Sequence, residues 1–313
     1  MPRKVDDVGD MIWGLLLHLG YNMWCDREAP DLGTEHIAAR PHLRCDGGLW
    51  GDLTVRAADA GLNMVVIDLG EGVRYESHPE LAVEGAWTPG ELRAELARLR
   101  GLGLEPIPKL NFSATHDAWL GEYSRCVSTP RYYQVCQELI GEACELFDGP
   151  RLFHLGMDEE TWQHQRHYAY VVIRQHELWW HDLAFLVEQV ERRGSQAWVW
   201  SDYAWHHDEY TQQMPRSVLQ SNWYYGLEFD PPCNEVATYQ RLAGAGYAQV
   251  PTGSNWTTPE NMERTVAYCR ENLPAEGLRG FLMTAWKPTL LSERERHEQA
   301  IDLLAQAKAI WEA

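Results

Sequence analysis

The sequence predicts an α/β fold, a (β/α)8 TIM barrel formed by residues 1–313 as a single domain. Eight short apolar runs alternate with longer amphipathic segments, as parallel strands and their crossover helices do. The length of 313 residues fits such a barrel with modest insertions. An open doubly wound sheet is the rival, but Gly20 is followed by Tyr-Asn-Met-Trp rather than by a Gly-rich phosphate-binding turn. No Pro-rich or Ser-rich linker divides the chain.

Each predicted element has its own local signal. The strands are short apolar or aromatic runs bounded by Gly, Pro or Asn, predicted at 12–19, 63–69, 105–112, 152–158, 197–202, 218–223, 248–255 and 281–286. The clearest helices carry start or stop signals, such as Pro89 in a first turn and Gly194 after a last turn. They are predicted at 88–102, 130–147, 175–193, 259–272 and 293–311.

Charge and cysteine content exclude several classes of protein. The net charge is −19, and so acidic a surface repels phosphate backbones and anionic lipids, so we expect neither nucleic acid nor membrane as a partner. Seven scattered cysteines without a C-x-x-C pair indicate reduced thiols and a cytoplasmic enzyme. We expect an amino terminus without a signal peptide, because Asp6, Asp7 and Asp10 follow the first basic residues. No run reaches the ~18 apolar residues that span a bilayer.

The aromatic composition gives the first indication of a ligand. The chain has 15 Trp and only 6 Phe. Tryptophan combines a wide flat face with an N–H donor, which suits stacking on sugar rings, although it is also simply a large core side chain.

The fourth predicted strand carries the most specific chemical pattern. Strand alternation places His154, Gly156 and Asp158 on the side that faces the barrel axis, and Glu159 follows where the strand ends. Two neighbouring carboxyl groups at a barrel mouth do not both ionise easily, so the pKa of one rises. Glycosidic bond cleavage uses one proton donor and one negative group in this way. The alternative is a solvated acidic cap at the start of a helix.

Neighbouring strand ends add aromatic and hydrogen-bonding groups at the same level of the barrel. They are Asn111, Phe112, His116, Asp117 and Trp119 after strand 3; Trp198, Trp200 and Asp202 in strand 5; Asn222, Trp223 and Tyr224 in strand 6; Asn255 and Trp256 in strand 7; and Thr284 and Trp286 in strand 8. Several tryptophans at successive strand ends, with a few polar groups between them, predict a small-ligand pocket.

The segment His154-Leu-Gly-Met-Asp-Glu159 resembles the His-x-Gly-x-Asp-Glu motif of glycoside hydrolase family 20, the β-N-acetylhexosaminidases, whose catalytic domain is a (β/α)8 barrel. The resemblance implies that Asp158 orients the substrate's 2-acetamido group and that Glu159 is the general acid/base. His116 resembles the strand 3 histidine of that family. The tryptophans Trp200, Trp223 and Trp286 resemble those that enclose the acetamido methyl and the sugar ring.

Two departures from the family pattern concern sugar recognition. The family's arginine at the end of strand 1 is missing from His18-Leu-Gly-Tyr-Asn-Met-Trp24, and Arg27 is the nearest candidate. Trp286 is followed by Lys287 instead of an acidic residue, which suits an anionic or differently substituted sugar.

The resemblance implies retaining hydrolysis of a terminal 2-acetamido-2-deoxy-β-hexose, in which the acetamido oxygen is the nucleophile and no metal or cofactor takes part. Asp158 and Glu159 are the expected catalytic residues, and the expected substrate-binding residues are His116, His154, Trp200, Asp202, Trp223, Tyr224, Trp256 and Trp286. His154 would support Asp158 or bind backbone, and Tyr224 would hydrogen-bond the acetamido oxygen.

Three alternatives remain open at this point. The first is a two-carboxylate glycosidase acting on a sugar without an acetamido group, with Asp202 or Asp68 as the partner of Glu159. The second is a catalytically inert sugar-binding barrel. The third is a metal-dependent hydrolase using His154, Asp158 and His116. The exposed aromatic rim would also serve a contact between subunits in a homo-oligomer.

Overall fold

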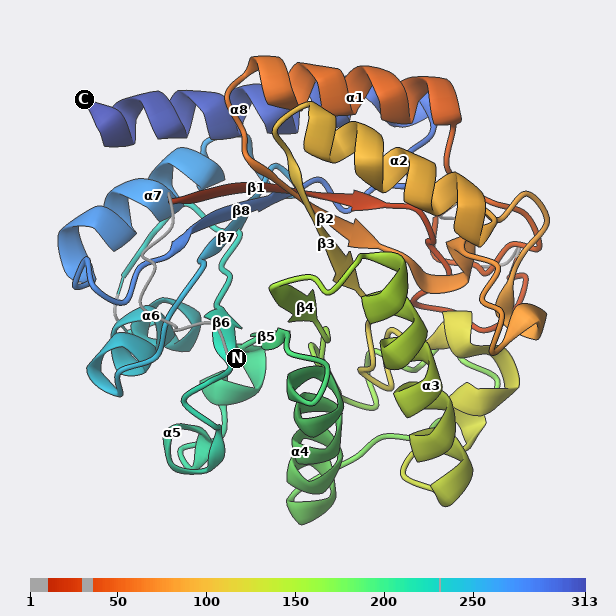
Figure 1. The fold of residues 1–313 in the computed structure, drawn as a ribbon. Helices are drawn as coiled ribbons and strands as arrows, with labels where there is room; N and C mark the ends of the chain where they lie inside the picture. Colours follow the sequence, from red (N-terminus) through yellow and green to blue (C-terminus); the bar gives the residue numbers. More distant parts are fainter. Residues whose placement is uncertain (1–10, 30–35, 231) are drawn as a thin grey trace.

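The computed structural model describes residues 11–29, 36–230 and 232–313. Eight parallel strands form one sheet with the helices outside it, as Figure 1 shows. The strands are β1 (Ile12–His18), β2 (Met64–Asp68), β3 (Glu105–Lys109), β4 (Leu152–His154), β5 (Gln196–Trp200), β6 (Leu219–Ser221), β7 (Thr252–Ser254) and β8 (Gly280–Thr284). The predicted absence of a signal peptide rests on residues 1–10, which lie outside the described residues.

The sheet closes into a barrel. Its strand order is β6-β5-β4-β3-β2-β1-β8-β7, which leaves β6 and β7 at the two ends. Isolated parallel bridges join these ends at Gln220–Gln249 and Trp223–Thr252. The backbone N–H of Gln220 donates to the carbonyl oxygen of Ala248 at 3.0 Å. The predicted (β/α)8 barrel is confirmed.

The five predicted helices are confirmed, and each predicted end lies within two residues of the observed one. They are α2 (Pro89–Gly101), α3 (Pro130–Leu146), α4 (Glu177–Glu191), α7 (Asn261–Asn272) and α8 (Arg294–Glu312). The sequence prediction did not name α1 (Gly47–Asp59), α5 (Tyr210–Gln213) or α6 (Asn234–Gly244). Short 3₁₀ helices complete the chain: η2 (Gly70–Gly72), η3 (Pro79–Leu81), η4 (Ala118–Arg125), η5 (Asp202–Trp205) and η6 (Leu291–Glu293).

Within the described part of the chain, no helix is both long enough and apolar enough to traverse a bilayer.

Strand β4 ends earlier than the sequence predicts, and this matters for the site. The prediction carried it to Asp158, but the ladder stops at His154. Beyond that point Gly156, Met157 and Glu159 have φ values of 73°, 78° and 53°. These left-handed conformations turn the chain sharply and would not fit in a strand.

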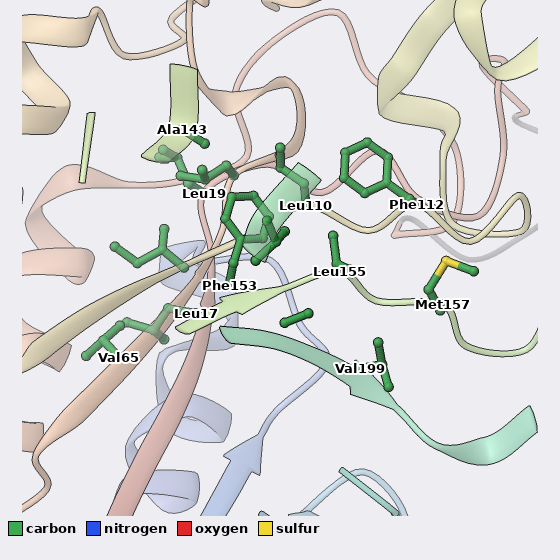
Figure 2. Packing of buried hydrophobic residues seen from close by; sticks show 14 of the residues in the cluster. Leu17, Leu19, Val65, Leu110, Phe112, Ala143, Phe153, Leu155, Met157 and Val199 are labelled. Atoms are coloured by element: carbon green, nitrogen blue, oxygen red, sulfur yellow. The ribbon is translucent and has the colours of Figure 1, made fainter. Parts of the chain in front are cut away.

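Two hydrophobic cores support this turn from opposite sides of the sheet. Phe153, Leu155 and Met157 point into the outer core between strands and helices, where Figure 2 shows them with Leu110 and Val199. The inner core fills the barrel with alternate strand residues, including Trp198 and Trp200. The outward anchors therefore fix the chain immediately before Asp158.

Candidate active site

Asp158 lies at the mouth of the barrel, buried and held by polar contacts. Its Oδ1 accepts a hydrogen bond from Asn111 Nδ2 at 2.8 Å and lies 3.8 Å from His116 Nδ1. The carbonyl oxygen of Asp158 accepts from Ser113 Oγ at 2.5 Å. The segment after β3 therefore fixes both the backbone and the side chain of Asp158.

Gly156 is required where it stands. The side chain of Asn111 fills the space beside Gly156, between His154 and Asp158. A Cβ on Gly156 would lie 2.0 Å from Asn111 Oδ1. The same oxygen accepts from the N–H groups of Ser113 at 3.0 Å and Met157 at 3.3 Å, so Asn111 links the two loops.

Glu159 is turned by its backbone toward two histidines. Its φ of 53° is unusual for a residue with a side chain, and its N–H donates to Asp202 Oδ2 at 2.7 Å. Its Oε2 lies 3.5 Å from His116 Nε2 and 3.5 Å from His164 Nε2. The Glu159 side chain is 28% exposed, so it can be reached from solvent.

The pKa values of the two carboxyl groups nearest Asp158, those of Asp202 and Glu159, shift in opposite directions. Burial, followed by the charge of Asp158, raises the pKa of Asp202 well above its usual value. Burial raises the pKa of Glu159 too, but the hydrogen bond and charge of His116 outweigh it, and the net shift is downward. The pKa of Asp202 is raised because that carboxyl is buried beside the charge of Asp158, and its Oδ1 has no hydrogen-bond partner.

His116 lies between the two predicted catalytic acids. Burial lowers the pKa of its imidazole, but the charges of Asp158 and Glu159 more than compensate, and the net shift is upward. Thr115 Oγ1 is 2.9 Å from His116 Nδ1. A positive His116 would offset the charge of Asp158 and Glu159 in the unliganded site.

The third acid of the run points away from the other two. The side chain of Glu160 is fully buried and makes an ion pair with Arg174 Nε at 2.6 Å and Arg174 Nη2 at 2.7 Å. Arg174 also lies 3.2 Å from Asp182 Oδ2 and donates to the carbonyl oxygen of Phe112 at 2.6 Å. This buried network anchors the chain immediately after Glu159.

Tryptophans from β5 and β8 form the apolar floor. Trp200 is buried, and its ring centroid lies 5.8 Å from that of Trp286. Trp286 is held on both sides, because its Nε1 donates to Tyr225 Oη at 2.8 Å and its carbonyl oxygen accepts from Tyr21 Oη at 2.7 Å.

Trp223 and Trp256 lie nearer the solvent. Trp223 packs on Trp205 with centroids 4.4 Å apart, and Trp256 is 50% exposed. Lys287 Nζ lies 5.7 Å from the centre of the Trp256 ring and 3.7 Å from Glu293 Oε2, so its charge already has a partner.

Two expected substrate-binding residues have other surroundings. Tyr224 packs outward against Phe229, with centroids 5.2 Å apart, and Tyr225 occupies the inward position beside Trp286. Burial raises the pKa of Tyr225, and the charges of Asp158 and Glu159 raise it further. Tyr225 therefore replaces Tyr224 as the candidate for a contact with the acetamido oxygen.

His154 is the second of these residues. It is fully buried under Trp200, at a centroid distance of 4.3 Å, and its Nδ1 accepts from the N–H of Gly156 at 3.0 Å. Of the two roles predicted for His154, the structure shows the bond to the backbone. Through this bond His154 positions the turn that carries Asp158. The metal-hydrolase alternative that included His154 loses one of its three ligands.

The end of β1 shows what stands where the family's arginine is missing. His18 Nδ1 lies 3.3 Å from Asp68 Oδ2, and the same oxygen accepts from Lys109 Nζ at 2.5 Å. Burial raises the pKa of Asp68, but Lys109 and His18 outweigh it and bring the value to about 2. The charges of Asp68 and Lys109 therefore neutralise each other inside the barrel. Arg27, the nearest arginine in the sequence, is exposed.

A cavity of about 340 Å³ opens beside the site. Its walls come from the β4–α4 segment and the chain after β5, and they include Trp162, Gln163, His176, Tyr203 and His207. The rings of Tyr203 and His207 are stacked with centroids 3.7 Å apart.

No protein-family model matches the chain, and no curated protein sequence matches it. Solved structures do. A β-N-acetylhexosaminidase from Bacteroides fragilis matches with a TM-score of 0.67 over 96% of this chain and 65% of its own, at 13% identity.

Two further solved structures have similar values. A GH20 exo-β-N-acetylglucosaminidase from Vibrio harveyi, in complex with N-acetylglucosamine, gives 0.62 over 96% and 57%, at 14% identity. An N-acetyl-β-hexosaminidase from Streptomyces plicatus gives 0.63 over 95% and 64%, at 15% identity. The chain thus spans 57–65% of the length of these proteins and has the fold of their matching part.

Proposed function

We propose that this protein is a glycosidase, a divergent member of glycoside hydrolase family 20, which removes a terminal 2-acetamido-2-deoxy-β-hexose with retention of configuration. One observation carries the proposal. Asp158 and Glu159 follow β4 on one tight turn, face the same histidine from both sides, and lie beside the tryptophans of β5 and β8. The solved structures that share the fold are hydrolases of N-acetylhexosamines by their own descriptions.

Glu159 is the general acid in the proposed mechanism. It protonates the leaving oxygen, the substrate's acetamido oxygen attacks the anomeric carbon, and water activated by Glu159 later opens the cyclic intermediate. In the unliganded site the pKa of Glu159 is low because of His116. A bound sugar would exclude water from Glu159, and this added burial raises the pKa of the carboxyl toward the protonated form that the first step needs.

Asp158 has the complementary role. Its carboxylate accepts the hydrogen bond of the acetamido N–H and stabilises the positive charge of the oxazolinium-like intermediate. Asn111 holds one of its oxygens at 2.8 Å, which fixes the carboxylate plane. Trp200 and Trp286 would enclose the acetamido methyl and the sugar ring.

The two-carboxylate alternative is disfavoured by the surroundings of its candidate nucleophiles. Asp202 is buried with a raised pKa, and one of its oxygens already accepts the N–H of Glu159. Asp68 is paired with Lys109 inside the barrel. A carboxyl group whose charged form is disfavoured by burial and one that is held in an ion pair are both poor nucleophiles.

A pair of aryl glycosides tests the function. We expect hydrolysis of the aryl 2-acetamido-2-deoxy-β-glucoside with the β-anomer as first product, and at least about 10²-fold slower hydrolysis of the plain aryl β-glucoside. Equal rates would contradict acetamido participation. Binding of both sugars without turnover would favour the inert barrel instead.

We also propose a cytoplasmic location. All seven cysteines are free thiols, four of them buried. Fractionation of the producing cells tests this, and protein recovered mainly outside the cytoplasm would contradict it.

A further inference from the structure

The first half of the loop after β1 is held rigidly by two buried charged side chains. Glu71, which follows β2, accepts through Oε1 the N–H groups of Tyr21 at 2.7 Å and Asn22 at 2.9 Å. Arg44 donates through Nη2 to the carbonyl oxygen of Tyr21 at 2.7 Å and to Asn22 Oδ1 at 2.8 Å. Both residues of the loop are therefore fixed from two directions.

The second half of the loop is held by the segments that follow β3 and β4. The hydroxyl of Tyr168 donates to the carbonyl oxygen of Met23. A backbone N–H of the β4–α4 segment donates to Asp26 Oδ1 at 2.9 Å, and Asp26 also forms an ion pair with Arg125. The loop therefore extends from β1 to the β4 side of the barrel mouth, with anchors before and after its middle.

Trp24 occupies the middle of this loop. The residues directly before and after it are buried, whereas Trp24 is partly exposed. Its indole N–H makes no hydrogen bond within the described residues. Its ring meets Tyr21 edge-on at 5.3 Å between centroids and His116 at 6.1 Å. Because His116 contacts Asp158 and Glu159, Trp24 stands next to the predicted catalytic acids.

Trp24 comes from a different half of the mouth than the tryptophans already placed in the site. Those lie on or after β5 to β8: Trp200, Trp223, Trp256 and Trp286. Ligand pockets are lined mostly by apolar and aromatic side chains, with a few polar groups that fix the ligand. An indole on the β1 side would complete such a lining around Asp158 and Glu159.

The buried cations near this loop already have partners. Besides its bonds to the loop, Arg44 donates through Nη1 to the carbonyl oxygen of His36 at 3.1 Å. Lys109 is paired with Asp68. On this side a ligand would therefore meet a flat ring and an N–H donor rather than either of these charges, which suits an uncharged part of a sugar.

We propose that Trp24 is a further substrate-binding residue, which packs against the 2-acetamido sugar on the β1 side of the pocket, and that Asp26 positions it. This inference rests on the proposed function, because it takes the sugar of that reaction as the ligand. The anchored loop and the place of Trp24 beside His116 are independent of it.

Steady-state kinetics with the aryl 2-acetamido-2-deoxy-β-glucoside test the contact. Trp24→Ala should raise KM about 10-fold and leave kcat within about threefold, because it removes a contact that the bound substrate and the transition state share. Trp24→Leu keeps apolar bulk without the flat ring and should behave in the same way, whereas Trp24→Phe should retain most of the affinity. The control is Trp311→Ala, which removes a part-buried tryptophan near the end of α8 and should leave KM unchanged.

A double-mutant cycle tests the positioning role of Asp26. Asp26→Ala should raise KM about threefold in the wild-type background and have no further effect in Trp24→Ala, because its influence passes through the indole. Independent, multiplying effects of the two substitutions would overturn this role.

Calorimetry with a thiazoline mimic of the cyclic intermediate measures the same contact without turnover. We expect about 10-fold weaker binding to Trp24→Ala than to wild type. Hydrolysis with unchanged KM and unchanged mimic affinity in folded Trp24→Ala and Trp24→Leu would overturn the inference and leave the proposed function intact. Weaker mimic binding in these variants, with no hydrolysis by wild type, would support Trp24 and contradict the proposed function. A wild type that neither binds the mimic nor hydrolyses the glycoside would overturn both.

Discussion

The two sides of the barrel differ in how far their strands run. Strands β8, β1, β2 and β3 have five to seven residues each, and β1 stays in register with β2 over five pairs. On the other side, β4, β6 and β7 have only three residues each, and β5 alone has five. Apart from His116 and Trp286, every predicted site residue lies on or after β4 to β7. A chain that leaves the ladder early can adopt left-handed turns and bring neighbouring side chains together, which a long ladder prevents.

We call the side formed by β8, β1, β2 and β3 the regular side, and the side formed by β4 to β7 the short-stranded side. The buried charges of the regular side are paired with one another. His18, Asp68 and Lys109 neutralise one another at the ends of β1, β2 and β3. On the short-stranded side, Asp158, Glu159 and Asp202 face no Lys or Arg partner in any described ion pair, and only histidines lie near them. We conclude that the regular side is a scaffold and that the short-stranded side holds titratable groups in reactive surroundings.

The largest expected effect is on the chemistry of the short-stranded side. Glu159→Gln should lower turnover about 10²–10⁴-fold by removing general acid catalysis, and the loss should be smaller for leaving groups that need little protonation. Asp158→Asn should lower turnover whatever the leaving group. Steady-state kinetics with an activated aryl glycoside and a natural-type glycoside measure both. Identical losses for both variants on both substrates would contradict the assigned roles.

The second effect concerns the buried ion pair behind Glu159. Arg174→Met leaves Glu160 buried without its partner and should reduce the free energy of unfolding by about 3–5 kcal/mol. The control is Arg151→Met, which removes an exposed bidentate pair with Glu105 and should change it by about 0–1 kcal/mol. Denaturant unfolding measures both changes. Similar losses in the two variants would show that the short-stranded side is not anchored by Arg174.

The third effect isolates crowding from backbone strain. Gly156 and Gly103 have φ values of 73° and 80°, but a Cβ meets Asn111 only at Gly156 and open space at Gly103. Gly103→Ala should lower stability by about 1–2 kcal/mol, since it adds strain alone. Gly156→Ala should lower it by about 1–3 kcal/mol more, and should also reduce activity, because Asn111 must move. If the two variants were equally stable and Gly156→Ala kept full activity, the contact between Gly156 and Asn111 would not matter for the site.

The smallest effect tests the regular side, where α8 packs against β8 and β1. Burial lowers the pKa of His297 to about 4, so the fold favours its neutral form. This stabilising preference is complete above the unfolded pKa of about 6.5 and is lost as pH falls toward 4. Wild type should therefore lose about 2 kcal/mol more than His297→Asn between pH 7 and pH 5. Parallel pH profiles of unfolding would contradict this.

Much of the fold could be predicted because strands and helices leave periodic signals. The eight apolar runs predicted the strands of the barrel, and the start of α2 was predictable because Thr88 caps it. Helix α1 escaped because Gly47, Gly48 and Gly51 weaken its first turns, which depend on the Asp46 cap instead.

The candidate site was predictable only in part. Asp158 and Glu159 lie in a specific motif, and His116 follows a well-defined strand. Tyr225 was within reach of the sequence, since alternation from Leu219 through Trp223 points it inward. His164 and the pair of Glu160 with Arg174 were not, because they lie in an irregular segment where no periodicity indicates which side chains meet.

The most direct test of the central claim is a crystal structure with a thiazoline mimic of the cyclic intermediate. We predict an Asp158 oxygen within about 2.7–3.2 Å of the ring nitrogen, Glu159 beside the anomeric carbon, and the methyl group between Trp200 and Trp286. A mimic bound elsewhere, or one that leaves Asp158 attached only to Asn111 and out of contact, would contradict the account.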